Sequence, residues 1–283
     1  MAEIAPGAAL RITGFPMSNA NSSPDLWSGA EVSDDQIRAL AIGAYYGRSW
    51  GAYNDTVAFE PDLPGSTETR REATIEGLHE AWGVDNADDA RDTIRRLLAG
   101  MHAPLFTLIH PLAVIASAES YRPDRTSIAA GHREFLHTLS NFRGYEGGSG
   151  LDRDYDAWLQ TIKLGIVDGL PQPLHTDATA WDLARVVFIA RSAYTAGYLP
   201  EDEAWEHMLA GLAIAQQHYR NWRQLSAGFL TGAIYWAATQ DLAAAKEQVG
   251  ERRKMLYGLH SRPSSPWRRI ALHPGTPVLG APQ

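Results

Sequence analysis

Polar side chains between residues 182 and 205 have the types and the spacing to bind a ligand or to form ion pairs. Asp182 and Arg185 are three residues apart, so on a helix they lie one turn apart and can pair. Arg191 follows on the same predicted helix, and the acidic residues 201–203 begin the next helix after a tight turn. Because so short a connection favours antiparallel packing, we expect Arg191 to lie close to that acidic start.

Two interpretations of this group are open. In the first, ion pairs lock a hairpin of two helices and neighbouring aromatic side chains pack beside them, which is the usual role of charges on amphipathic helices. In the second, Asp182, Arg185 and Arg191 line a cleft for an anionic or polar ligand, with acid–base chemistry as a further option. The pattern assigns no catalytic residue. The binding residues of the second interpretation are Asp182, Arg185, Arg191, Tyr198, Glu203 and Trp205.

Patterns typical of metal enzymes and hydrolases are incomplete. Glu134 and His137 match one half of the di-iron site of helical bundles, but the sequence holds no second copy of that motif. The absence of cysteine removes thiolate metal sites, iron–sulfur clusters and cysteine nucleophiles. Residues 148–150 lack the flanking pattern of a nucleophilic serine turn and the lysine of a phosphate-binding loop. We therefore expect no bound metal and no cofactor.

The composition is that of a soluble globular protein. The 283 residues are 45% hydrophobic, and the formal net charge of −8 argues against binding to nucleic acid or to an anionic membrane face. Residues 1–20 have neither the basic start nor the apolar stretch of a secretion signal. The apolar run 108–118 is too short to span a bilayer. These features predict a cytoplasmic protein that binds neither a membrane nor nucleic acid.

Helix signals recur along the chain, whereas strand-like alternation is scarce. Ser33 is predicted to begin a capping box, and Asn86 is predicted to cap a later helix. The regions 178–196, 200–219 and 222–240 carry apolar residues at helical spacing. The sequence therefore predicts an all-α fold.

The predicted organisation is a bundle-like single globular domain with two flanking segments. The helical domain covers residues 31–274, after a loosely ordered N-terminal arm at residues 1–30 and before a tail at residues 275–283. The glycine-rich residues 144–150 are the best candidate for a boundary inside the domain.

Several tryptophans and their neighbours resemble a known family, in the order Asn54, Asp55, Trp82, Gly83, Trp181, Asp182, Arg185, Ala190, Arg191, Ala196, Gly197, Tyr198, Glu203, Trp205, Trp222, Gly232, Tyr235, Trp236, Ser265, Pro266 and Trp267. Over residues 37–272 this order is similar to that of the bacterial family called domain of unknown function 1266. Ser192 departs from the pattern, since a larger aromatic side chain is expected there. The resemblance implies a helical fold and no established activity. It also favours Trp267 as a side chain that plugs back into the bundle, rather than basic residues near the C-terminus forming a docking surface.

Two classes of function follow. The first is a non-enzymatic interaction module, an adaptor or an inhibitor-like binder of another bacterial protein, which uses an exposed face of the bundle. The second is an enzyme or small-molecule-binding protein with a polar site around Asp182, Arg185 and Arg191. A closed core with these side chains in ion pairs favours the first class, and a pocket into which they converge favours the second.

Overall fold

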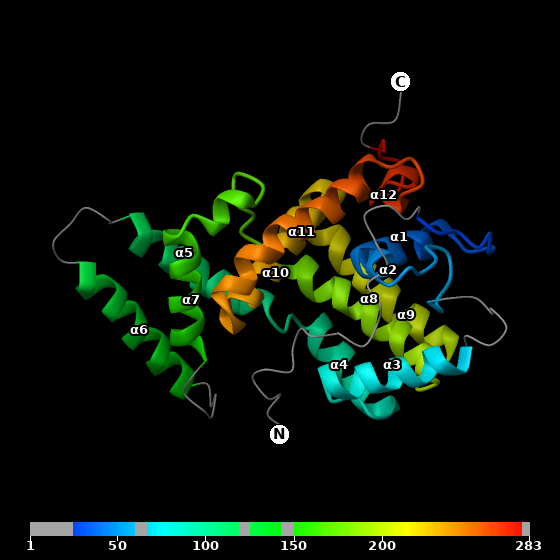
Figure 1. The fold of residues 1–283 in the computed structure, drawn as a ribbon, viewed down its shortest axis with the longest axis horizontal. Helices are drawn as coiled ribbons and strands as arrows, with labels where there is room; N and C mark the ends of the chain where they lie inside the picture. Colours follow the sequence, from blue (N-terminus) through cyan, green and yellow to red (C-terminus); the bar gives the residue numbers. More distant parts are fainter. Residues whose placement is uncertain (1–24, 60–66, 119–124, 143–149, 279–283) are drawn as a thin grey trace. The chain divides into compact units, whose positions relative to one another are not determined.

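The fold is all-α, as predicted. The computed structural model describes residues 25–59, 67–118, 125–142 and 150–278, and within these ranges no strand forms. In chain order the elements are α1 (Asp34–Ile42), α2 (Ala44–Ser49), α3 (Thr67–Trp82), α4 (Ala87–Leu98), α5 (Ala103–Ala118), α6 (Arg125–Phe142), α7 (Leu151–Lys163), the 3-10 helix η1 (Ile166–Gly169), α8 (Thr179–Ala196), α9 (Glu201–His218), α10 (Trp222–Gln240), α11 (Leu242–Ser261) and α12 (Pro266–Arg269) (Figure 1). The bounds of α8, α9 and α10 confirm the three helices predicted in the C-terminal half.

The chain forms two compact units, each built from separate stretches of sequence. The first unit holds residues 1–101, 182–226 and 253–283, and the second holds residues 102–181 and 227–252. Helices α8, α10 and α11 contribute residues to both units. Of the glycine-rich run 144–150 predicted as an internal boundary, residues 144–149 lie outside the described ranges.

The helix ends of the first unit follow the capping signals of the sequence. The Ser33 hydroxyl accepts a hydrogen bond from the Gln36 amide at 3.2 Å, and the Gln36 side chain accepts one from the Ser33 amide at 2.8 Å. Asn86 caps α4 by accepting from the amides of the two following aspartates. Gly197 ends α8 with a φ of +80°, a conformation that favours glycine.

Arginine side chains join distant segments of the first unit through backbone carbonyl groups. The Arg38 guanidinium donates to the Ala271 carbonyl at 3.0 Å, and Arg71 donates to the Ala196 carbonyl at 3.1 Å. Because carbonyls at helix ends and in loops lack an intrahelical donor, such bonds satisfy groups that are costly to bury alone.

Tryptophan side chains do the same at the C-terminal end of the chain. The Trp267 indole donates to the Ala41 carbonyl at 2.7 Å, and the Trp222 indole donates to the Ile270 carbonyl at 2.8 Å. The two rings are stacked with centroids 5.8 Å apart, and Trp267 is buried. The predicted plugging role of Trp267 is confirmed.

The last residues of the predicted N-terminal arm are attached to the first unit. The buried Asp55 carboxylate accepts hydrogen bonds from the backbone amides of residues 28–30 at 2.7–3.2 Å. Asn54 donates to the Leu26 carbonyl, and Trp27 donates to the Ser264 carbonyl. Residues 1–24 of the arm lie outside the described ranges.

The second unit packs α5 and α6 against α7, and these three helices lie side by side in Figure 1. Its core is aromatic: Phe106 makes edge contacts with Trp158 and with Tyr235, and all three side chains are buried. On α10, Gly232 leaves room for Trp181, since a Cβ at position 232 would lie 2.5 Å from the Trp181 Cβ. A side chain at position 232 would therefore displace Trp181.

Candidate functional site

Asp182 and Arg185 form the ion pair that their spacing predicts. The Arg185 guanidinium donates to the Asp182 carboxylate one turn away on α8, and the two side chains are 5% and 0% exposed. Arg185 also lies over the ring of Trp82, 5.7 Å from its centroid. Burial lowers the pKa of Arg185, and the adjacent Asp182 carboxylate opposes that shift. The pair is therefore buried inside the first unit.

Arg191 is buried as well, but the prediction that it meets the acidic start of α9 is wrong. Its guanidinium donates to the carbonyls of Tyr53, Val57 and Ala58 at 2.9–3.0 Å and lies 4.9 Å from the Phe59 ring centroid. Burial lowers the pKa of Arg191 to about 9, so the side chain is still charged at neutral pH. It therefore fixes residues 53–59 against α8.

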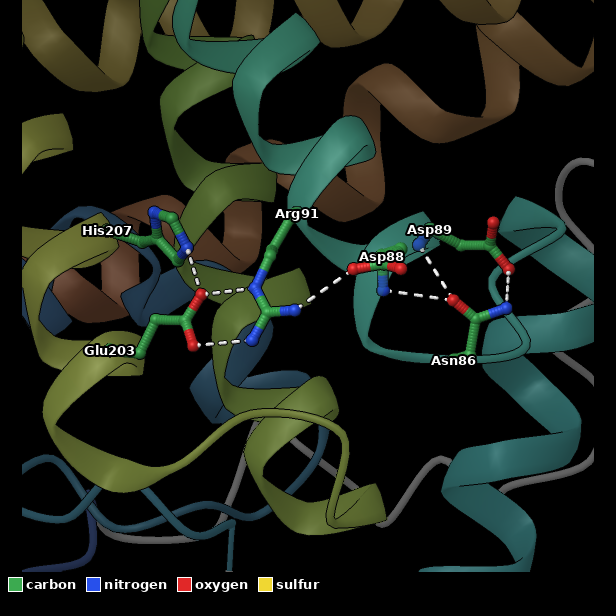
Figure 2. A network of polar contacts seen from close by, with 6 residues as sticks. All are labelled: Asn86, Asp88, Asp89, Arg91, Glu203 and His207. Carbon is green, nitrogen blue, oxygen red and sulfur yellow. Dashed lines mark hydrogen bonds and ion pairs between the residues drawn. The ribbon is translucent and has the colours of Figure 1, made fainter.

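Glu203, expected near Arg191, pairs with an arginine of α4 instead. Figure 2 shows the Arg91 guanidinium donating two hydrogen bonds to the Glu203 carboxylate, at 2.6 and 2.9 Å. His207 approaches the same carboxylate at 3.6 Å, one turn along α9. The hydrogen bonds from Arg91 lower the pKa of Glu203, so this carboxyl stays ionised and is unsuited to act as a general acid. The contact joins α4 to α9.

The two aromatic residues of the predicted site have separate surroundings. The Trp205 indole donates to Glu201 at 3.2 Å within α9, and its ring is 8% exposed. Tyr198 follows the left-handed Gly197 at the end of α8, and burial raises the pKa of its hydroxyl. The structure thus brings Asp182 and Arg185 together and leaves Arg191, Tyr198, Glu203 and Trp205 in contacts of their own.

A serine–histidine contact in the first unit has no counterpart in the sequence prediction. The Ser226 hydroxyl lies 2.8 Å from His260 Nε2 and also donates to the Arg223 carbonyl at 3.0 Å. Burial lowers the pKa of His260 to about 4, so the imidazole in this contact is neutral at pH 7. Thirty-four residues separate the two side chains, so no local motif marks the pair.

The second unit holds a half-buried carboxyl, Asp154, that sequence reasoning also missed. Burial raises the pKa of Asp154 to about 6, and the neighbouring Asp152 adds to that shift while Arg153 opposes it. The buried Tyr235 hydroxyl of α10 faces Asp154 and opposes the rise in its pKa. Asp154 reads in the sequence as an ordinary acid in the first turn of a helix, so nothing there signals its burial.

The half-motif for a di-iron site lies on the surface of α6. Glu134 and His137 are both exposed, whereas His132 bonds to the Tyr155 hydroxyl at 3.0 Å. Among the described residues, no group of three or more histidines and carboxylates is placed to hold a metal ion.

The side of α5 that faces solvent is apolar and carries no charge. The exposed residues of this α5 face are Pro104, Thr107, Pro111, Val114, Ile115 and Ala118. They recur every three or four residues, so they form one stripe along the helix. Val114 and Ile115 are 41% and 49% exposed. By length and composition alone, the helical stretch 87–118 is long and apolar enough to cross a membrane.

Comparison with known proteins gives a family. A family model described as "Protein of unknown function (DUF1266)" matches residues 77–272. The chain belongs to the DUF1266 family. It is also similar to "Uncharacterized protein YbeR" of Escherichia coli (strain K12), with 25% identity over 218 residues that cover 71% of this chain and 79% of the relative. No solved structure matches.

The matched DUF1266 region includes most of the residues described above. It begins inside α3 and ends at Leu272, so it contains the Asp182–Arg185 pair, the Arg91–Glu203 contact and the Trp267 plug. Residues 53–59, which Arg191 holds, lie before it.

Proposed function

We propose that this DUF1266 protein is a non-enzymatic, cytoplasmic interaction module, an adaptor or inhibitor-like binder, and that the α5 face is its docking surface. The uncharged, solvent-facing stripe of α5 carries the proposal. Soluble proteins rarely leave a contiguous apolar surface open unless it binds something. The charged residues of the alternative polar site already have partners inside the first unit. Asp182 pairs with Arg185, and Arg191 donates to backbone carbonyl groups.

The chemistry of the α5 face selects the kind of partner. Helix α5 contains no aspartate, glutamate, lysine or arginine, so a charged partner surface would be desolvated without a counter-charge. An apolar surface, such as one side of an amphipathic helix, has no charge to desolvate in the same contact. It would also bury the exposed Val114 and Ile115. We therefore propose a protein partner with an uncharged apolar surface.

Affinity capture with matched variants tests this function. The wild-type chain, Ile115→Glu and Tyr257→Glu are used as baits in a lysate of the organism that encodes the protein, with quantitative mass spectrometry as the readout. Tyr257 is the control because it is a large apolar residue, 73% exposed, on α11 of the first unit. We expect one partner to be retained by the wild type and by Tyr257→Glu and lost by Ile115→Glu.

Two outcomes would contradict the proposal. One is an unchanged set of captured proteins for Ile115→Glu, whose melting temperature should equal that of the wild type because the side chain is half-exposed. The other is sedimentation of the wild type with phospholipid vesicles that Ile115→Glu abolishes, since this would make the α5 face a lipid-binding surface.

A further inference from the structure

Helix α6 has a second apolar stripe, on the side away from its own core contacts. Toward the unit it buries Leu136 and Ser140. On the exposed side lie Phe142, 86% exposed, and Phe135, 51% exposed. Two phenylalanines in solvent on one helix are costly, because each leaves a large apolar surface in water.

The exposed residues of this stripe have the spacing of a two-helix seam. Gly131, Phe135, Thr138 and Phe142 are separated by four, three and four residues, and all four are exposed. This is the a/d repeat by which two helices pack side chains of one into holes of the other. We call these four residues the α6 seam.

The α6 seam is complementary to itself when two copies run antiparallel. If Phe135 lies opposite Thr138 of a second copy, the same register places Phe142 opposite Gly131. A Cβ at Gly131 would meet nothing within 4 Å, so the surface there is open to receive a ring. In a parallel pair, each phenylalanine would instead lie opposite the same phenylalanine of the second copy. Gly131 would then lie opposite Gly131, and the gap between them would lose van der Waals contacts.

The polar neighbours of the seam agree with this register. Glu134 is the one carboxylate in the sequence of α6, and antiparallel pairing brings it beside Asn141 of the second copy rather than beside another Glu134. An amide can donate to a carboxylate, so this flank adds a hydrogen bond and avoids like charges. Arg133 is held by Asp156 of α7 and stays out of the contact.

We propose that the α6 seam binds a second copy of this chain, forming a two-fold symmetric dimer through antiparallel α6 helices. The inference is independent of the α5 face and of the function proposed for it. Because one helix from each copy supplies the contact, the dimer is of the small, concentration-dependent kind. The dimer is two-fold symmetric because the pattern is self-complementary: Phe135 of each copy lies opposite Thr138 of the other, and Phe142 of each copy lies opposite Gly131 of the other.

Sedimentation of the full chain at increasing concentration tests the proposal. We expect the mass of the wild type to rise from 31.0 kDa toward twice that value. Phe142→Glu and Gly131→Phe should both remain monomeric, the first by removing the ring and the second by filling its receiving space. Leu164→Glu, at an apolar position of the same unit that is 63% exposed, should sediment as the wild type does.

A swapped variant tests the register itself. In Gly131→Phe combined with Phe142→Ala, the ring and the open space exchange places, so the double variant should recover the dimer that Gly131→Phe loses. Thermal melts keep loss of folding apart from loss of association, because both sites face solvent and should melt as the wild type does. A wild type that stays monomeric at every concentration, or a swapped variant that fails to recover, would overturn the proposal.

Discussion

The Arg185 guanidinium donates to the Asp182 carboxylate inside the first unit, and an ion pair with the same spacing, Asp92 with Arg95, lies on the surface of α4. The two pairs differ in exposure: 5% and 0% for Arg185 and Asp182, against 72% and 52% for Arg95 and Asp92. They are therefore a natural comparison for what burial does to an ion pair.

Arg185→Ala should be strongly destabilising. It leaves the Asp182 carboxylate buried without its guanidinium partner, which typically costs about 3–5 kcal/mol of unfolding free energy. At this chain length that loss corresponds to a melting temperature roughly 5–10 °C lower. Arg95→Ala should cost at most about 1 kcal/mol, since an exposed pair is screened by water. Thermal melts of the two variants measure the difference, and equal melting temperatures would contradict the structural role of the buried pair.

Arg191→Lys should loosen residues 53–59 while leaving α8 helical. An ammonium group cannot reach the three carbonyls that the planar guanidinium serves, so some of them lose their donor, at a cost of about 1–3 kcal/mol for each buried group left unpaired. Hydrogen exchange read by mass spectrometry should show faster exchange at residues 50–59 and unchanged exchange in α4. Unaltered exchange at residues 50–59 would show that this segment is held by other contacts.

Ser192→Ala should stabilise the protein. The Ser192 hydroxyl is buried and has no hydrogen-bond partner among the residues that the structure describes, so its removal takes away a desolvation cost of roughly 1 kcal/mol. Ser226→Ala is the matched control on α10, because that hydroxyl is also buried but is bonded to Arg223 and His260. We expect the melting temperature to rise for Ser192→Ala and to fall for Ser226→Ala. A fall for both would mean that the Ser192 hydroxyl has a partner.

Asp154→Asn should stabilise the protein at alkaline pH and have little effect in acid. Burial raises the pKa of Asp154 from 3.8 to about 6, so the folded state favours the protonated carboxyl. Its contribution is fully present below pH 3.8 and is lost as the pH rises through about 6. Asparagine mimics the neutral form at every pH, so the gain above pH 7 approaches about 3 kcal/mol, from a shift of roughly two pKa units. Denaturant unfolding at pH 4 and pH 8 checks this, and a gain of equal size at both would rule out the titration of Asp154 as its cause.

The sequence predicted those features that depend on residues close together along the chain. The capping box at Ser33, the cap at Asn86 and the Asp182–Arg185 pair each involve neighbours on one helix, where spacing alone determines contact. The Trp267 plug was predicted too, from the resemblance to the family rather than from local spacing.

Long-range partners could not be predicted in the same way. Arg191 bonds to carbonyls more than 130 residues away, and Glu203 bonds to Arg91 across 112 residues. Carbonyl acceptors occur at every residue and leave no mark in the sequence. An arginine that binds them therefore looks the same as one that seeks a carboxylate. The partial burial of Asp154 was missed for a related reason, since its neighbour Tyr235 lies on α10, far away in the sequence.

Affinity capture with Ile115→Glu beside Arg95→Ala and Tyr257→Glu tests the central claim, that the protein works by binding through the α5 face, most directly. We predict that Ile115→Glu keeps the melting temperature of the wild type and loses a partner that the other two variants retain. Capture of the same proteins by Ile115→Glu and the wild type would contradict the claim.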